Sequence, residues 1–386
     1  LQADFNHFEK NNRLWLDDFA EFMAIKEHFG NQALQKWDDK KAVARDPSAL
    51  EKYRILLAEQ IQYFKVTQYF FFKQWSELKH YSNQKGIKII GDMPIYVAAD
   101  SVEVWTKPEL FQLDEERNPL FVAGVPADQF SATGQLWGNP LYDWEEHKKQ
   151  GYAWWIHRIE ESFKIYDVLR IDHFKGFSDY WQVDGKAEIA KDGSWQPGPG
   201  YDLFKAVKEQ LGDLPIIAED LGNIDDKARK LLADCNYPGM KILQFGFEDV
   251  SGESLDSPHY CIPHSIVYTG THDNDVTNGW YNGLTEQQQQ YINDYTHRSE
   301  DESICQAMIR QLFAAVSNTA IATMQDVLDL PASSRMNVPS TIGGNWQWRM
   351  QQSDLTQDKK DFLAKMTTLY QRANQENPMI KFSTFV

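Results

Sequence analysis

The chain has 386 residues, of which 42% are hydrophobic and 25% charged, so it is long and apolar enough to bury a sizeable core. Its formal net charge of -17 disfavours binding to nucleic-acid phosphates and to anionic membrane surfaces, whereas a neutral ligand is compatible with it. No apolar run reaches the length of a membrane span and no signal peptide is visible, so we expect a cytoplasmic protein without a membrane partner.

The predicted elements begin with helices and continue as short strands that alternate with helices. The first ninety residues are predicted to be helical, with apolar residues at helical spacing from Leu50 to Lys85 and a stop at Gly86. Six apolar segments then predict strands, at residues 87–90, 168–171, 215–218, 241–247, 265–269 and 321–327. Helices are predicted at 201–211, 225–234 and 286–295. This alternation favours an α/β fold with a parallel sheet, as in a (β/α)8 barrel.

The segment between the first two predicted strands is too long for a simple connection. It is rich in Trp, Gly and Pro and includes GQLWGNP at Gly134 to Pro140. We therefore predict that residues 97–166 form an inserted subdomain that covers the active site, within a catalytic domain that takes in residues 1–386.

Acidic residues stand at the ends of four predicted strands: Asp92, Asp172, Glu219 and Asp273. One such residue usually forms a turn or caps a helix. A barrel, however, brings its strand ends together, and four neighbouring carboxylates repel one another and cost stability. The joint pattern therefore favours a catalytic site over coincidence.

Clustered carboxylates without an evident Ser or Cys nucleophile suit glycoside cleavage. A retaining enzyme needs an ionised carboxylate as nucleophile and a protonated carboxyl group as acid, about 5–5.5 Å apart. Arg170 lies two residues before Asp172, so it shares that side of the strand and places a cation there, although an internal salt bridge is the plainer interpretation. Glu219 follows three apolar residues, a setting that favours the acid role. His272, beside Asp273, is a candidate donor to a sugar hydroxyl.

A divalent metal site is the competing interpretation, because magnesium-dependent enolising enzymes also carry carboxylates at barrel strand ends. Such enzymes need a Lys or His base on a facing strand. The predicted strand KILQFGF offers no such group beyond Lys241, and the last predicted strand offers none. The three cysteines, Cys235, Cys261 and Cys305, are far apart and favour free thiols over a metal site or a disulfide.

Several strings resemble one family, the 4-α-glucanotransferases, also called amylomaltases or disproportionating enzymes, of glycoside hydrolase family seventy-seven in the α-amylase clan. These strings are GDMPIYV, PADQFSATGQLWGNPLYDW, VLRIDHFKGF, IIAEDLG, PGMKILQF, TGTHDND and RMNVPSTIGGNWQWR. The resemblance covers nearly the whole chain. It implies that Asp172 is the nucleophile, Glu219 the acid and base, and Asp273 the residue that stabilises the transition state.

The resemblance also implies the substrate-binding residues. Arg170, His272 and Asp92 are expected to bind the donor glucosyl unit, and Asn337 to contact the substrate. Asp128, Gln135 and Trp137 are expected in a loop over the acceptor side. The implied donor and acceptor are maltooligosaccharides or an α-1,4-glucan, and neither a cofactor nor a metal ion is implied.

The sequence departs from the family in three places. Gln129 replaces an aromatic residue, and Ser340 stands where glycine is usual. Family members also begin upstream of Leu1, so we expect the six strands to be the third to eighth of the barrel, and the chain alone to be a poor catalyst. Two alternatives stay open: an α-glucan hydrolase of the same clan, and an inactive glucan-binding fragment.

Overall fold

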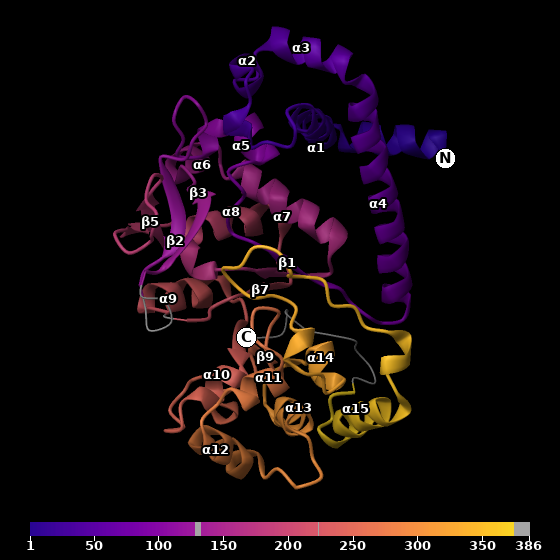
Figure 1. Cartoon of the computed structure of the whole chain (residues 1–386), viewed down its shortest axis with the longest axis vertical. Coiled ribbons are helices and arrows are strands. Elements are labelled where there is room, and N and C mark those ends of the chain that lie inside the picture. Colours follow the sequence, from indigo (N-terminus) through magenta and orange to yellow (C-terminus); the bar gives the residue numbers. More distant parts are fainter. Residues whose placement is uncertain (128–132, 223, 374–386) are drawn as a thin grey trace. The chain divides into compact units, whose positions relative to one another are not determined.

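The computed structural model describes residues 1–127, 133–222 and 224–373. They form two compact units: a first unit of Leu1–Ile216 and Ile224–Cys235, and a second unit of Ile217–Asn223 and Asn236–Val386. Figure 1 shows the elements of each unit, coloured along the chain. Among the described residues, no helix has both the length and the apolar character that a membrane crossing requires.

The first unit begins with helices, as predicted: α1 (Gln2–His28), α2 (Lys40–Val43), α3 (Pro47–Leu56) and α4 (Ala58–Gln84), with a 3-10 turn, η1, at Leu34–Lys36. The side chains of Asp39 and Asp46 accept hydrogen bonds from the first amides of α2 and α3, which fixes where these helices begin. The predicted helix over 50–85 is interrupted, because the backbone of Leu57 leaves helical geometry between α3 and α4. Gly86, at φ +74°, follows the end of α4, as predicted.

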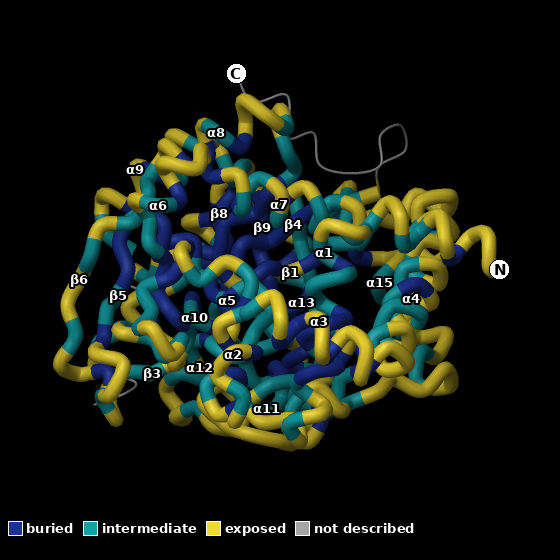
Figure 2. Tube along the Cα trace, turned by 90° about the horizontal axis from the view of Figure 1, so that it is seen from above, coloured by how far each residue is buried: buried dark blue, intermediate teal, exposed yellow. Residues whose placement is uncertain are grey.

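A parallel strand pair follows. β1 (Ile90–Met93) pairs with β4 (Val168–Ile171), and Asp92 lies opposite Arg170. On the other side of β4, the amide of Leu169 donates to the carbonyl of Pro215, the residue before β7 (Ile216–Ala218), at 3.0 Å. All four residues of β4 are buried, as Figure 2 shows. α7 (Ala153–Ile165) precedes β4 and α8 (Tyr201–Leu211) precedes β7, so the predicted alternation is present.

β1 begins three residues later than the predicted strand at 87–90, so Asp92 lies inside the strand. The cause is the end of α4, where the amide of Ile87 still donates to the carbonyl of Ser82. Gly91 is required inside β1, because a Cβ there would lie 2.1 Å from the ring of Tyr166.

The first unit also contains a four-stranded antiparallel sheet, with strand order β3-β2-β5-β6. Its strands are β2 (Phe121–Val125), β3 (Gln135–Pro140), β5 (Asp179–Asp184) and β6 (Ser194–Pro197), and the short helices near them are α5 (Val102–Thr106), η2 (Pro108–Leu110), α6 (Trp144–Lys149) and η3 (Phe174–Phe177). Only β2 and β3 come from residues 97–166, so this sheet continues beyond the predicted insert. α9 (Asp226–Cys235) completes the unit, and Lys175 Nζ donates to Asp225, just before it, at 2.7 Å.

The second unit contains three further parallel strands, with β9 (Ser265–Tyr268) between β8 (Gly239–Ile242) and β10 (Thr319–Ile321). Its helices are α10 (Leu243–Glu248), η4 (Pro258–Tyr260), α11 (Thr277–Asn282), α12 (Glu286–Thr296), α13 (Ile304–Ala314), α14 (Met324–Val327), η5 (Ala332–Ser334), η6 (Gln352–Asp354) and α15 (Gln357–Leu369). Val267 of β9 packs in a buried core with Ile292 of α12 and Met308 of α13.

Two of the predicted strands in this unit were too long. Only the start of 241–247 is a strand, because Leu243 and Phe247, four residues apart, both enter the core as one face of α10. The segment 321–327 leaves the strand after Ile321. There the side chain of Thr323 accepts a hydrogen bond from the amide of Asp326 and starts α14.

Candidate active site

In the first unit, the structure brings together three predicted site residues: Asp92, Arg170 and Asp172. Arg170 Nη1 lies 2.7 Å from both carboxylate oxygens of Asp92 and 3.0 Å from Oδ1 of Asp172. The parallel register sets Asp92 opposite Arg170, and the two-residue spacing sets Asp172 on the same side of the strand. The side chain of Arg170 is only 9% exposed, whereas those of Asp92 and Asp172 are 39% and 40% exposed. A buried cation therefore holds two carboxylates that solvent, and hence a ligand, can reach.

This arrangement also bears on the competing metal interpretation. The guanidinium of Arg170 lies between the two carboxylates that a divalent ion would need as ligands in this unit. A metal ion there would have to displace a buried cation from contacts of 2.7–3.0 Å. The geometry therefore disfavours a divalent ion between these two carboxylates.

His173 follows Asp172 in the left-handed conformation, at φ +51°. Burial lowers its pKa to about 4, although the adjacent charge of Asp172 opposes that shift, so the imidazole is neutral near pH 7. Trp137 meets it edge-on with ring centroids 4.8 Å apart, and Trp137 Nε1 donates to Gln135 Oε1 at 3.2 Å. The predicted residues Gln135 and Trp137 of β3 are thus connected to His173, the residue next to Asp172.

Trp137 is 36% exposed, so part of its ring remains free for another contact. The third residue predicted in this covering loop, Asp128, lies outside the described residues, as does Gln129. What we predict for these two residues therefore rests on the sequence alone.

In the second unit, Glu219 follows β7 directly and is 9% exposed. Its Oε1 accepts a hydrogen bond from the amide of Leu221 at 2.8 Å, which orients the carboxyl group. The next residue, Asp220, is half-buried, and its Oδ1 accepts from the amide of Met240 at 2.7 Å. Burial raises the pKa of Asp220, and Gly239 leaves it room, because a Cβ there would lie 2.3 Å from the Asp220 carboxylate.

A second group of predicted residues surrounds Asp273 in this unit. Asn337 Nδ2 donates to Asp273 Oδ1 at 2.6 Å, and His272 Nε2 lies 3.3 Å from Asp273 Oδ2. The structure thus brings His272, Asp273 and Asn337 together, although Asn337 lies 64 residues further along the chain. Asn337 thus gives Asp273 a hydrogen bond from a neutral amide and no counter-charge.

Arg335 is a site residue that the sequence analysis missed. Its Nη2 donates to the backbone carbonyl of Asp273 at 2.6 Å, and its Nε donates to the carbonyl of Asn337 at 2.8 Å. It therefore fixes both partners of the Asp273–Asn337 hydrogen bond. The only signal was its place in RMNVPSTIGGNWQWR, two residues before Asn337.

Buried residues fix the loop that carries His272 and Asp273 at both ends. Asp326 accepts hydrogen bonds from the hydroxyl of Thr269 at 2.6 Å and from the amide of Thr277 at 2.8 Å. Gln244 donates to the carbonyl of Asp275 at 2.9 Å. Buried hydrogen bonds thus hold both ends of the loop in place, as a preorganised site requires.

The segment after Asn337 contains a run of left-handed residues. Ser340, Gly343, Gly344 and Trp346 have φ values of +63°, +82°, +76° and +61°. Ser340 occupies a conformation that favours glycine, which accounts for the family's usual residue at this position. Trp346 lies with its ring centroid 5.1 Å from that of His272, so the segment returns to the Asp273 group.

All three cysteines are free, as predicted. Burial raises the pKa of each thiol, to about 12 for Cys235, so they are poor nucleophiles near neutral pH. The nucleophile of this site is therefore to be sought among the carboxylates.

A family model described as 4-alpha-glucanotransferase matches residues 1–356. The 4-alpha-glucanotransferase of Streptococcus pneumoniae is 52% identical over 373 residues, which cover 96% of this chain and 74% of that protein. That of Clostridium butyricum is 43% identical over 373 residues, covering 95% of this chain and 76% of that protein.

Among solved structures, the amylomaltase from Streptococcus agalactiae in complex with acarbose matches with a TM-score of 0.95 and 58% identity, covering 97% of this chain and 75% of that one. This match confirms the predicted fold class, an α/β fold of the (β/α)8 barrel type.

Proposed function

Because the chain belongs to the 4-alpha-glucanotransferase family, as its motifs predicted, we propose that it moves α-1,4-glucan segments between maltooligosaccharides by double displacement. The observation that carries this proposal is the contact of Arg170 with both Asp92 and Asp172. It supplies a solvent-accessible carboxylate beside a buried cation, which is what a nucleophile that must stay ionised needs.

In the first step, the Asp172 carboxylate attacks the anomeric carbon of a donor glucosyl unit, and the bond to the leaving oxygen breaks. Glu219 gives that oxygen a proton, and a covalent glucosyl ester forms on Asp172. In the second step, Glu219 takes the proton from the 4-hydroxyl of an acceptor sugar, which attacks the same carbon. The ester breaks, the Asp172 carboxylate is regenerated, and the configuration is retained.

The remaining predicted residues have supporting roles in this proposal. Asp273 stabilises the oxocarbenium-like transition state, and Arg170, His272 and Asp92 bind the donor unit, with Asn337 as a further contact. Asp128, Gln135 and Trp137 act on the acceptor side, within an insert at 97–166 that covers the site. Free thiols favour a reducing compartment, so we also propose a cytoplasmic enzyme, and the charge of -17 argues against a nucleic-acid partner.

Incubation with maltotriose tests the proposal and separates it from its alternatives. A ladder of longer maltooligosaccharides, together with shorter products, is the expected outcome. Glucose and maltose alone would indicate the hydrolase, and binding without turnover would indicate the inactive glucan-binding fragment. Asp172→Asn serves as the blank, because any ladder that it still forms arises from a contaminating activity or from another nucleophile.

A further inference from the structure

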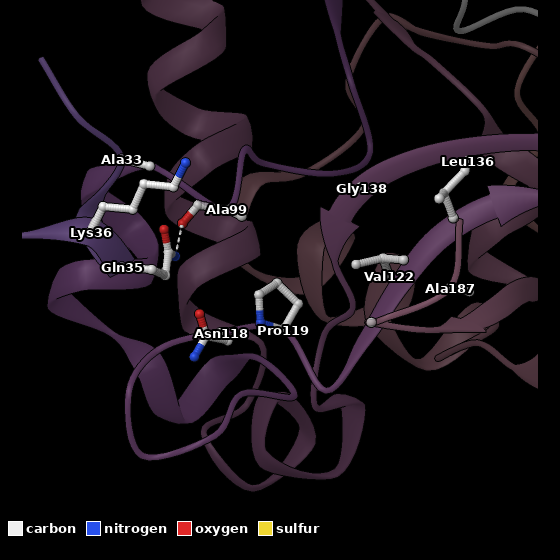
Figure 3. A pocket seen from close by; sticks show the side chains of 11 residues that line it. Ala33, Gln35, Lys36, Ala99, Asn118, Pro119, Val122, Leu136, Gly138 and Ala187 are labelled. Carbon is white, nitrogen blue, oxygen red and sulfur yellow. Dashed lines mark hydrogen bonds between the residues drawn. The ribbon is translucent and has the colours of Figure 1, made fainter. Parts of the chain in front are cut away.

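Two cavities in the described part of the first unit differ in size and lining. The smaller, shown in Figure 3, has a volume of about 330 Å³ and is lined mainly by small residues such as Ala33, Ala99 and Gly138. The Gln35 side chain that points into it already donates to the Ala99 carbonyl, at 2.9 Å. This cavity offers no large apolar surface, and it carries no proposal.

The larger cavity has a volume of about 700 Å³, within the range of about 300–1,000 Å³ that is typical of small-molecule sites. It is lined by residues of α1, α4, α5 and α7, so one unit provides all of its walls. None of the predicted site residues lines it. It is therefore distinct from the cluster of residues around Asp172 and from the one around Asp273.

Aromatic rings form much of its wall. Trp15 of α1 and Phe72 of α4 lie with ring centroids 5.5 Å apart and with their planes tilted by 49°, so they are neighbours in the wall. Phe71, also of α4, is 46% exposed and lies nearly parallel to Trp75, which supports it from behind. Trp154 of α7 is a fourth lining ring. Such faces suit the C–H faces of sugar rings as well as they suit apolar ligands.

Polar groups in the same wall decide between these two ligand classes. Within the described part of the chain, the side-chain amide of Gln68, the carboxylate of Glu103 and the indole N–H of Trp154 line the cavity and have no hydrogen-bond partner. An apolar ligand would leave these groups unpaired as it displaced water from them, which costs free energy. A ligand with both apolar faces and hydroxyl groups would satisfy rings and polar groups together.

The charge of the wall narrows the class further. The lining includes three acidic residues and two basic ones, and the chain as a whole is strongly acidic. Neither balance suits an anionic ligand such as a phosphate. A neutral, polyhydroxylated ligand fits best.

The wall also contacts the strand that carries Asp92. Arg158 donates to the carbonyls of Pro94 at 2.7 Å and Ile95 at 3.1 Å, directly after β1. Ser162 Oγ lies 3.8 Å from the sulfur of Met93. Both Arg158 and Ser162 line the cavity, so a ligand there would touch residues that support the Asp92 strand.

We propose that this cavity, between α1, α4, α5 and α7, binds a segment of an α-glucan at a distance from the reacting bond. The proposal rests on the proposed function for its substrate class. The glucose units place their C–H faces on Trp15, Phe71 and Phe72, and their hydroxyls pair with Gln68, Glu103 and Trp154. A long donor is thereby held by a second contact that a trisaccharide bound at the carboxylates does not use.

The test is a titration of the full chain with maltoheptaose, in an Asp172→Asn background that prevents turnover. Two binding events are expected, the second weaker. Phe71→Ala and Gln68→Ala should each weaken the second event by about tenfold or abolish it. Phe70→Ala is the matched control, because Phe70 is the neighbouring residue on α4, is 40% exposed and does not line the cavity. It should leave both events unchanged.

The enzyme's preference for long donors gives a second measurement. The ratio of transfer from amylose to transfer from maltotriose should fall several-fold in Phe71→Ala and stay at the wild-type value in Phe70→Ala. A single binding event that neither Phe71→Ala nor Gln68→Ala alters would overturn the proposed cavity site. Failure of the wild-type chain to extend maltotriose would instead contradict the proposed function, and the titration would still report on the cavity.

Discussion

In the first unit the carboxylate of Asp172 faces a buried guanidinium, whereas in the second unit the carboxylate of Asp273 faces a neutral amide and a fixed backbone. Arg170 contacts Asp172 at 3.0 Å, and Asn337 contacts Asp273 at 2.6 Å, with Arg335 holding the Asp273 carbonyl. A charge contact favours the ionised state of its partner, while an amide contact mainly fixes its direction. This difference suits the separate tasks proposed for the two carboxylates, in which Asp172 attacks and Asp273 faces a developing positive charge.

The largest effect is expected from removing the charge of each carboxylate in turn. Asp172→Asn should lower transfer by about ten-thousandfold or more, because a two-step mechanism loses its nucleophile. Asp273→Asn should also lower kcat strongly, yet leave the covalent step possible, so a slow accumulation of glucosyl-enzyme should be detectable by mass spectrometry only in this second variant. Retention of more than about a hundredth of the wild-type rate by Asp172→Asn would show that Asp172 is not the nucleophile.

Replacing Arg170 tests whether Asp92 and Asp172 depend on the charge of its guanidinium. Arg170→Gln leaves Asp92 and Asp172 side by side without their cation, and we expect transfer to fall by about a hundredfold or more. The free energy of unfolding should fall by about 2–3 kcal/mol, less than for a fully buried pair because both carboxylates are partly exposed. Arg170→Lys is the control, and it should recover part of both losses. Equal effects of Gln and Lys would argue for shape instead of charge.

Replacing Arg335 tests whether catalysis depends on the position in which it holds Asp273 and Asn337. Arg335→Gln removes the donors to the carbonyls of Asp273 and Asn337, so kcat should fall by about tenfold to a hundredfold with little change in KM. Arg335→Lys should restore part of kcat. Arg349→Gln, at an exposed arginine of the same motif, should have no effect. If Arg335→Gln lowered only the melting temperature, Arg335 would be structural and not a positioning residue.

Trp137→Ala should produce a smaller change, in the partition between transfer and hydrolysis. The ring is partly exposed and contacts His173, so its removal should admit water near Asp172 and lower the transfer-to-hydrolysis ratio several-fold. The ratio is measured as free glucose against longer products from maltotriose. An unchanged ratio with a lower melting temperature would show that Trp137 only packs the insert.

The smallest expected effect is a dependence of stability on pH, with opposite signs in the two units. Burial raises the pKa of Asp220, so its protonated form stabilises the fold below about pH 4 and this contribution is lost as pH rises through the raised pKa. Asp220→Asn can still accept from Met240, and its melting temperature relative to wild type should therefore rise between pH 4 and pH 7.

Asp225 in the first unit is the matched case. Its hydrogen bond with Lys175 lowers its pKa, so its ionised form stabilises the fold above about pH 4 and this contribution is lost as pH falls through the lowered pKa. Asp225→Asn should therefore destabilise the protein more at pH 7 than at pH 3. Parallel pH profiles for Asp220→Asn and Asp225→Asn would contradict the difference in burial and pairing between the two sites.

In the described part of the chain, local sequence patterns predicted a strand at each of the six parallel strands, yet at none of the four strands of the antiparallel sheet. The contact of Arg170 with Asp172 follows from a two-residue spacing, and α8 has the bounds predicted for it. The errors arose where a short apolar run is compatible with both a strand and a helix. Leu243 and Phe247 were predicted in a strand, yet they form one face of α10. The side chain of Thr323 with Asp326 three residues later was an available signal for the start of α14.

Contacts between distant segments could not be read from spacing. Arg335 and Asp273 are 62 residues apart, and only the fold brings the guanidinium to that carbonyl. The same holds for Asp326, which joins Thr269 and Thr277 across 57 and 49 residues. Nothing in the local sequence distinguishes Arg335 and Asp326 from the many charged surface residues of this acidic chain. The family motif contains Arg335, but only the fold shows that this residue contacts Asp273 and Asn337.

The path of the chain between the two units has a consequence for biosynthesis. The polypeptide leaves the first unit after Ile216, contributes residues 217–223 to the second, and returns for α9 before leaving again after Cys235. No single proteolytic cut can therefore release either unit whole. During translation, at about 5–20 residues per second, the first unit must wait for α9 to emerge from the ribosome. Glu219 is made before α9, yet the strands of its own unit, β8 to β10, are still to be made. We thus expect a nascent chain, halted at the point where α9 has just emerged from the ribosome, to protect Asp172 from protease while the segment around Glu219 stays cleavable.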